Sequence, residues 1–265
     1  LDSGHREAAR ACTALLSEIG RHDDVARVLE NHLASLNDEY AKVVIHLQLG
    51  RLYAEVLGDS SRARAHFEAI MAMRPTHYPA ATALRALYRD ADEAPLLLDV
   101  LRVLLEYMPD VETRWRLLDE MEAVADAVSA EERYAVARRK FDLFPADDAL
   151  RADFTTRSRA LQRDLTLAQS LERAAGRLFF GKSAGGALLR AAAEVYDERL
   201  PRPEDAVRCI RAALAIDPDD VGMQAALERL LRQQDDPKSL AELLESQLRR
   251  AATPDGSGTL RCGPV

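Results

Sequence analysis

Five prolines divide this 265-residue chain at nearly regular intervals. Pro75, Pro109, Pro145, Pro218 and Pro254 are separated by 34, 36, 73 and 36 residues, and 73 is close to twice 36. The missing mark falls near position 181, where the sequence FFGKSAGG supplies a glycine-rich break. Proline cannot continue the hydrogen bonds of a helix, and it biases the preceding residue away from helical geometry. The spacing therefore predicts a repeated unit that is long enough for two helices and their turns.

The stretches between these marks have the apolar spacing of helices. Leu97, Leu101, Leu104 and Leu105, for example, recur at intervals of three and four residues. The chain is 48% hydrophobic but only 5% aromatic, and alanine and leucine supply most of its apolar residues. Because strands select β-branched and aromatic side chains, this composition argues against a β-sandwich, a barrel or a doubly wound sheet.

Comparison of the chain with itself gives further evidence for the repeat. When the chain is shifted so that Pro75 falls on Pro218, Tyr53 falls on Tyr196, and the match continues without a gap as far as Leu105 on Leu248. We call this displacement the repeat shift. Fifteen of the 53 positions from 53 to 105 are identical under it. Matches that recur at helical spacing are expected where packing imposes the repeat.

Two segments carry the residues of a known repeat. Residues 46–75 hold Gly50 and Tyr53 in a first helix, followed by Ala63, Phe67 and Pro75 in and after a second. Residues 187–218 hold the corresponding set, which is Tyr196, Ala206, Ile210, Ala213 and Pro218. Both segments resemble the tetratricopeptide repeat, with one extra residue that we expect in the turn between the two helices.

This resemblance implies an all-α fold, a right-handed α-solenoid of stacked antiparallel helix pairs. We expect one tetratricopeptide-like domain over residues 1–252, with about six helix pairs and the best units at 43–75 and 186–218. Residues 253–265 are rich in Gly, Pro, Ser and Thr and are expected to form a flexible tail or linker. The ratio of 32 arginines to 4 lysines indicates a GC-rich bacterial genome, and the chain can be one part of a longer repeat protein.

One string requires a separate interpretation, because Gly176 to Ser183 match the phosphate-binding pattern GxxxxGK[ST]. In a P-loop, backbone N–H groups around Gly176 and Gly181 would surround the phosphates, Lys182 would reach them and Ser183 would bind Mg²⁺. The loop should follow a buried strand, but LTLAQSLERAA upstream has a helical pattern. Its inner residues are bulky, and the repeat already requires a turn here. We therefore interpret the string as a turn and expect no cofactor.

No other pattern predicts chemistry. The six histidines lie in the first third of the chain without metal-ligand spacing, so no metal site is expected. The three cysteines have no recognisable histidine partner, so no catalytic residue is predicted. The net charge of −8 would repel nucleic acid. No apolar run reaches membrane-spanning length, and the first given residues, LDSGHREAAR, lack the apolar stretch of a signal peptide, so we expect no membrane insertion and a cytoplasmic location.

The resemblance instead implies a partner groove lined by the first helix of each pair. The charged residues at the groove positions are Arg51, Glu55, Arg89, Glu194, Asp197, Glu198, Arg229 and Arg232. We therefore expect a non-catalytic scaffold or adaptor that binds a peptide or protein segment. Two alternatives remain, namely the helical interaction arm of a larger enzyme or regulator, and a nucleotide-binding regulator that uses the GRLFFGKS loop.

Overall fold

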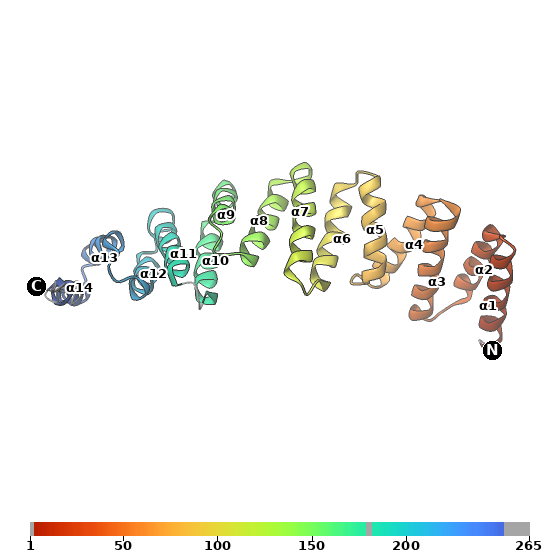
Figure 1. Cartoon of the computed structure of the whole chain (residues 1–265), viewed down its shortest axis with the longest axis horizontal. Helices are drawn as coiled ribbons and strands as arrows, with labels where there is room; N and C mark the ends of the chain where they lie inside the picture. The colour runs from red at the N-terminus through yellow and green to blue at the C-terminus, as the bar shows by residue number, and fades with distance from the viewer. Residues whose placement is uncertain (1–2, 179–181, 252–265) are drawn as a thin grey trace, which may run out of the picture. The chain divides into compact units, whose positions relative to one another are not determined.

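The computed structural model describes the backbone of residues 3–178 and 182–251, and the burial of side chains at 11–178 and 183–248. Within these ranges the chain consists of helices and turns and contains no strand (Figure 1). It divides into two compact units, residues 1–136 and 137–265, and the division falls within one helix.

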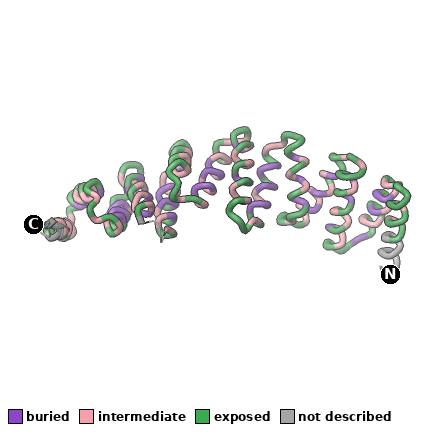
Figure 2. The backbone as a smooth tube through the Cα atoms, viewed as in Figure 1, coloured by how far each residue is buried: buried purple, intermediate pink, exposed green. Residues whose placement is uncertain are grey.

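The first unit contains three complete helix pairs and the start of a fourth. Its helices are α1 (Ser3–Glu18), α2 (His22–Ser35), α3 (Glu39–Arg51), η1 (Leu52–Leu57), α4 (Ser60–Met73), α5 (Tyr78–Asp90), α6 (Ala94–Tyr107), α7 (Val111–Val128) and the beginning of α8 (Ala130–Leu143). The second helix of each pair packs against the first helix of the next, as α2 does on α3, α4 on α5 and α6 on α7. Buried residues recur along these helices, as the purple segments of the backbone tube show (Figure 2).

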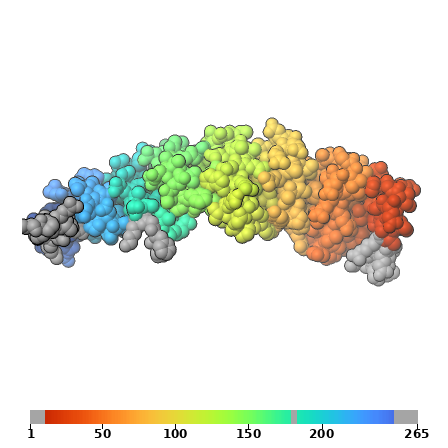
Figure 3. Space-filling view, in the orientation of Figure 1, coloured from red at the N-terminus to blue at the C-terminus, as the bar shows by residue number. Residues whose placement is uncertain are grey.

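The second unit repeats this arrangement. After the end of α8 it contains α9 (Asp148–Ala160), α10 (Asp164–Arg177), α11 (Lys182–Glu194), η2 (Val195–Arg199), α12 (Pro203–Ile216), α13 (Val221–Gln233) and α14 (Pro237–Ala251). From α9 to α14, each helix packs against the next one in the chain. In the space-filling view, successive helix pairs of a unit form contiguous layers (Figure 3). The prediction of an all-helical array of antiparallel helix pairs is confirmed.

The described residues form seven helix pairs, whereas the sequence predicted about six. The first pair is α1 with α2, and the end of α2 at Ser35 is followed by Leu36, Asn37 and Asp38 rather than by a proline. Asp38 fixes the start of the next helix, α3. Its carboxylate accepts a hydrogen bond from the backbone N–H of Ala41 (2.8 Å) and so caps α3. The single domain over residues 1–252 stays a prediction, and the proposed tail at 253–265 lies outside the described residues.

The extra residue of the two best units lies in the helix itself. In both units the first helix ends in a wider π-helical segment, η1 after α3 and η2 after α11. The repeat shift places Leu52, where η1 starts, on Val195, where η2 starts. The sequence placed the extra residue in the turn between the two helices. This expectation is wrong, because the wider π-helical segment at the end of the first helix contains it.

Candidate functional site

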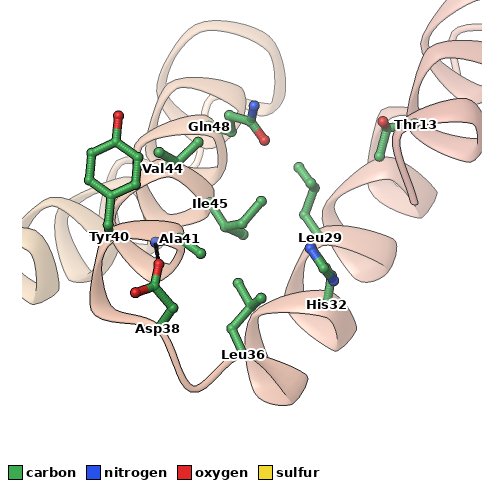
Figure 4. Close-up of a pocket in the computed structure, with 10 residues that line it drawn as sticks. All are labelled: Thr13, Leu29, His32, Leu36, Asp38, Tyr40, Ala41, Val44, Ile45 and Gln48. Carbon is green, nitrogen blue, oxygen red and sulfur yellow. Dashed lines mark hydrogen bonds between the residues drawn. The ribbon is translucent and has the colours of Figure 1, made fainter. Parts of the chain in front are cut away.

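A pocket of about 220 Å³ opens in the first unit between α1, α2 and α3 (Figure 4). It is lined by Thr13 from α1, by Leu29, His32 and Leu36 from α2 and its end, and by Asp38, Tyr40, Ala41, Val44, Ile45 and Gln48 from α3 and its cap. Leu29 and Leu36 are buried, whereas Tyr40 and Val44 are exposed. The pocket therefore has an apolar floor and an apolar side that solvent can reach.

The position of this pocket follows from the start of α3. The Asp38 cap begins the helix at Glu39, which places Tyr40 and Val44 one turn apart on the same face. The Tyr40 ring lies near the Arg74 guanidinium, 5.5 Å from Cζ to the ring centroid, and Arg74 Nε lies 3.6 Å from Glu39 Oε1. A cation over an aromatic face is attractive by about 0.5–1 kcal/mol at exposed sites. Arg74 thus supports the ring from one side.

The face that begins at the pocket continues along α3 and η1. Tyr40, Val44, Gln48, Arg51 and Glu55 follow one another at intervals of four, four, three and four residues, and all five are exposed. Residues at this spacing share one side of a helix. We call these five residues the α3 face. The structure therefore aligns the predicted site residues Arg51 and Glu55 with an apolar pocket that the sequence did not reveal.

Tyr40, Val44 and Gln48 are not among the residues that the sequence predicted for a site. Tyr40 and Val44 are apolar residues on a helix, and such residues are usually assigned to the core. The available signal was their spacing from Arg51, since they precede it by eleven and seven residues and so lie on its side of the helix.

Arg89 lies at the end of α5, also within the first unit, and is exposed. Its guanidinium is 4.0 Å from the Glu120 carboxylate, which also accepts a hydrogen bond from Arg85 Nε (3.1 Å). Both arginines therefore share one acidic partner on α7. The structure does not align Arg89 with the α3 face.

In the second unit the structure brings two of the five predicted residues together. Arg229 of α13 forms an ion pair with Asp197 of η2, and this contact raises the pKa of the Arg229 guanidinium. Arg232 instead pairs with Glu228 on its own helix (2.5 Å). Glu194 and Glu198 are exposed on α11 and η2. Exposed pairs of this kind are worth at most about 1 kcal/mol, so they leave the charges open to competition from a partner.

The P-loop-like string lies between two helices. Gly176 is in the last turn of α10 and Ser183 is in the first turn of α11, while Gly181 and the side chain of Lys182 lie outside the described residues. Ser183 lines a cavity of about 430 Å³ together with Arg190, Asp217 and Asp220, and Arg190 is paired with Asp220. Two carboxylates beside Ser183 make this cavity unfavourable for a phosphate group.

The described part of the chain offers neither a metal centre nor a membrane span. Among its residues, no group of three or more His, Cys, Asp or Glu side chains could hold a metal ion. No described helix is both long enough and apolar enough to cross a membrane. His46 of α3 and His66 of α4 are in contact, with their Nδ1 atoms 3.0 Å apart.

Comparisons with known proteins give structural likeness only. No protein-family model matches the sequence, and no curated protein matches it. A fragment of MamA from Desulfovibrio magneticus RS-1 is 19% identical, with 96% of this chain and 100% of that one covered and a TM-score of 0.33. A tetratricopeptide repeat protein from Parabacteroides merdae is 11% identical, with 86% and 100% covered and a TM-score of 0.38. A tetratricopeptide repeat protein from Thermus thermophilus is 17% identical, with 85% and 98% covered and a TM-score of 0.29.

The class of this protein follows from its own helices. Consecutive antiparallel pairs repeat along the chain, and alanines are fully buried at the repeat positions 63 and 206. Phe67 and Ile210, at equivalent positions of α4 and α12, are buried as well. The chain therefore has a tetratricopeptide-like helical repeat fold.

Proposed function

We propose that this protein is a non-catalytic scaffold or adaptor that binds a peptide or protein segment along the α3 face. The observation that carries the proposal is the apolar pocket at one end of a face whose other end bears Arg51 and Glu55. An apolar opening beside a few charged groups is a common design of ligand sites, in which the apolar part supplies affinity and the charges fix orientation.

The chemistry of the site defines the segment that would fit. One aliphatic or aromatic side chain would enter the pocket over Leu29 and Leu36, between Thr13 and Val44. Full burial of such a side chain contributes roughly 1.5–3 kcal/mol. Acidic and basic residues further along the segment would then meet Arg51 and Glu55. The preferred ligand is therefore a segment with one apolar anchor followed by charges of both signs.

The same proposal extends to the predicted groove residues of the other first helices. Arg89 on α5, and Glu194, Asp197, Glu198, Arg229 and Arg232 in the second unit, would contact further parts of a partner. Three of these residues now form ion pairs within the chain, which are Arg89 with Glu120, Arg229 with Asp197 and Arg232 with Glu228. These pairs would exchange for pairs with the partner. The net charge of −8 disfavours a nucleic acid in this role, so we propose a protein partner.

Peptide selection tests this proposal without a known partner. A displayed library of random peptides is selected on the full chain, and the affinities of the recovered peptides are measured by fluorescence anisotropy. Val44→Glu places a charge at the pocket rim and is expected to weaken binding at least tenfold. Val111→Glu is the matched control, because Val111 is also an exposed valine, at the start of α7. If the selected peptides bind the Val44→Glu variant as well as the parent, the site is assigned wrongly.

A further inference from the structure

His32 is a polar side chain beside the apolar floor of the pocket in the first unit. It lies on α2, three residues after Leu29 and four before Leu36, and all three residues line the pocket. Residues at this spacing share one side of a helix. Leu29 and Leu36 are 7% and 4% exposed, whereas His32 is half-buried. Figure 4 shows His32 next to Leu29, on the helix that faces Ile45 and Gln48 across the pocket.

The ring of His32 has no hydrogen-bond partner in the described part of the chain. Its backbone carbonyl accepts a hydrogen bond from the Ser35 hydroxyl (2.7 Å), but no described group bonds its ring nitrogens. By contrast, His46 and His66 contact one another, and His77 accepts a hydrogen bond from a backbone N–H at the start of α5. A polar group that loses its water under a ligand weakens binding unless the ligand pairs with it. The occupant of the pocket should therefore bring a hydrogen-bonding group to His32.

The pocket is large enough for an aromatic ring. A cavity of about 150 Å³ with apolar walls binds benzene. This pocket has a volume of about 220 Å³. The protein's own aromatic side chain leaves that space open, since the ring of Tyr40 points away from the other lining residues (Figure 4). A leucine or valine side chain is smaller than a benzene ring and would leave part of the pocket without contacts.

Tyrosine combines such a ring with the hydrogen-bonding group that His32 requires. A neutral histidine ring has one donor and one acceptor nitrogen, and a tyrosine hydroxyl can pair with either of them. The tryptophan N–H can only donate, and phenylalanine has no polar atom. Tyrosine hydroxyls usually have a hydrogen-bond partner where the side chain is buried.

We propose that the side chain of the partner segment that enters this pocket is a tyrosine. Its ring packs on Leu29 and Leu36, and its hydroxyl forms a hydrogen bond with the ring of His32. This inference rests on the proposed function, because it specifies the apolar anchor of the segment bound along the α3 face. The leucines supply affinity for any apolar anchor, whereas His32 selects tyrosine among them.

Anchor exchange in the selected peptides tests the proposal on the full chain. The anchor is the position at which alanine weakens binding to the parent protein but not to Val44→Glu. Versions of each peptide with tyrosine, phenylalanine, tryptophan or leucine at that position are compared by fluorescence anisotropy. We expect the tyrosine version to bind about tenfold more tightly than the phenylalanine version, because phenylalanine leaves the His32 ring unpaired.

Variants of His32 show whether the preference comes from this ring. His32→Leu should remove the preference for tyrosine, since leucine offers the hydroxyl no partner. His32→Gln keeps a donor and an acceptor and should retain the preference. His22→Leu is the matched control, because His22 is also half-buried on α2 but lies at its start, outside the pocket lining. This control should keep the full preference, and circular dichroism verifies that each variant keeps its helices.

The outcomes separate this inference from the proposed function. Peptides that depend on Val44 but bind equally well with phenylalanine, tryptophan or leucine overturn the tyrosine anchor and leave the α3 face in place. A tyrosine preference that survives in His32→Leu also overturns the inference, since another group would then bond the hydroxyl. Peptides that bind Val44→Glu as well as the parent overturn the proposed function and this inference together.

Discussion

The helix pair α3–α4 of the first unit and the pair α11–α12 of the second are two versions of one structure. Each contains a π-helical segment at the end of its first helix, with a buried tyrosine inside it. The Tyr53 hydroxyl donates a hydrogen bond to Glu30 (2.6 Å), and the Tyr196 hydroxyl donates one to Glu172 (2.8 Å). In both cases the glutamate belongs to the second helix of the preceding pair.

The two pairs differ in the side chains that fill the space around this frame. Gly50 and Phe67 in the first unit correspond to Ala193 and Ile210 in the second, and all four are buried. A Cβ atom at Gly50 would lie only 2.6 Å from Phe67 Cε1. A smaller residue on one helix thus accompanies a larger one on the other. The backbone geometry is shared, and the volume is divided differently between the two helices.

Gly50→Ala gives the largest effect expected from this comparison. The added methyl group would overlap the Phe67 ring, which must shift inside a closely packed core, so we expect a loss of roughly 2 kcal/mol. Thermal unfolding followed by circular dichroism measures the loss. Hydrogen exchange of the α3 and α4 amides locates it.

The double variant Gly50→Ala with Phe67→Ile is the control for Gly50→Ala. It recreates the pair found at Ala193 and Ile210, so most of the lost stability should return. A double variant that is no more stable than Gly50→Ala alone would contradict the view that the two pairs share one frame.

A second difference concerns polarity at the contact between the helices. His46 and His66 in the first unit correspond to Leu189 and Cys209 in the second. The pKa of His46 is lowered by burial and then by the neighbouring charges of His66 and Lys42. Burial also lowers the pKa of His66, although Glu30 opposes this shift. In the second unit, burial and Glu172 raise the pKa of the Cys209 thiol to about 12, so it stays neutral.

Acid should therefore loosen α3–α4 and leave α11–α12 unchanged. A histidine whose pKa is lowered by folding binds a proton more readily in the unfolded chain, so its contribution is complete above about pH 6.5. The contribution is lost as the pH falls from there toward the lowered pKa values. Hydrogen exchange near neutral pH and in mild acid, corrected for the intrinsic rate, compares the two pairs.

The swap variant isolates the role of the histidine pair in this acid response. His46→Leu with His66→Cys gives the first unit the residues of the second, and it should remove the pH dependence at α3–α4. His77, whose pKa is also lowered by burial, remains in both proteins and so cancels in the comparison. Equal acid sensitivity of the parent and the swap variant would show that other groups cause the effect.

The sequence predicted the positions of the helix pairs better than the geometry of the helix ends. Prolines and the repeat shift located the helix pairs and the buried positions of Ala63 and Ala206, because close packing restricts those positions to small side chains. The π-helical segments could not be predicted, since a one-residue insertion satisfies the same spacing in a turn or in a widened helix.

The sequence indicated only part of the candidate site. Family positions gave Arg51 and Glu55, but the pocket depends on which side of α3 is left uncovered by α1 and α2. Local spacing does not determine that arrangement. Tyr40 and Val44 would satisfy a core-facing pattern equally well, so only the packed helices reveal them as exposed.

The smallest expected effect concerns how the second helix of each pair begins. The Asp59 carboxylate accepts a hydrogen bond from the backbone N–H of Arg62 (2.9 Å) and caps α4, while the equivalent residue Arg202 makes no side-chain cap and α12 begins with Pro203. Asp59→Ala should cost roughly 1 kcal/mol, because it leaves an N–H of the first turn without its acceptor. Arg202→Ala should change stability little, because proline at the first helical position has no N–H to satisfy and its fixed φ suits the helix. Thermal unfolding of both variants measures the difference, and equal losses would show that the two helices begin by the same means.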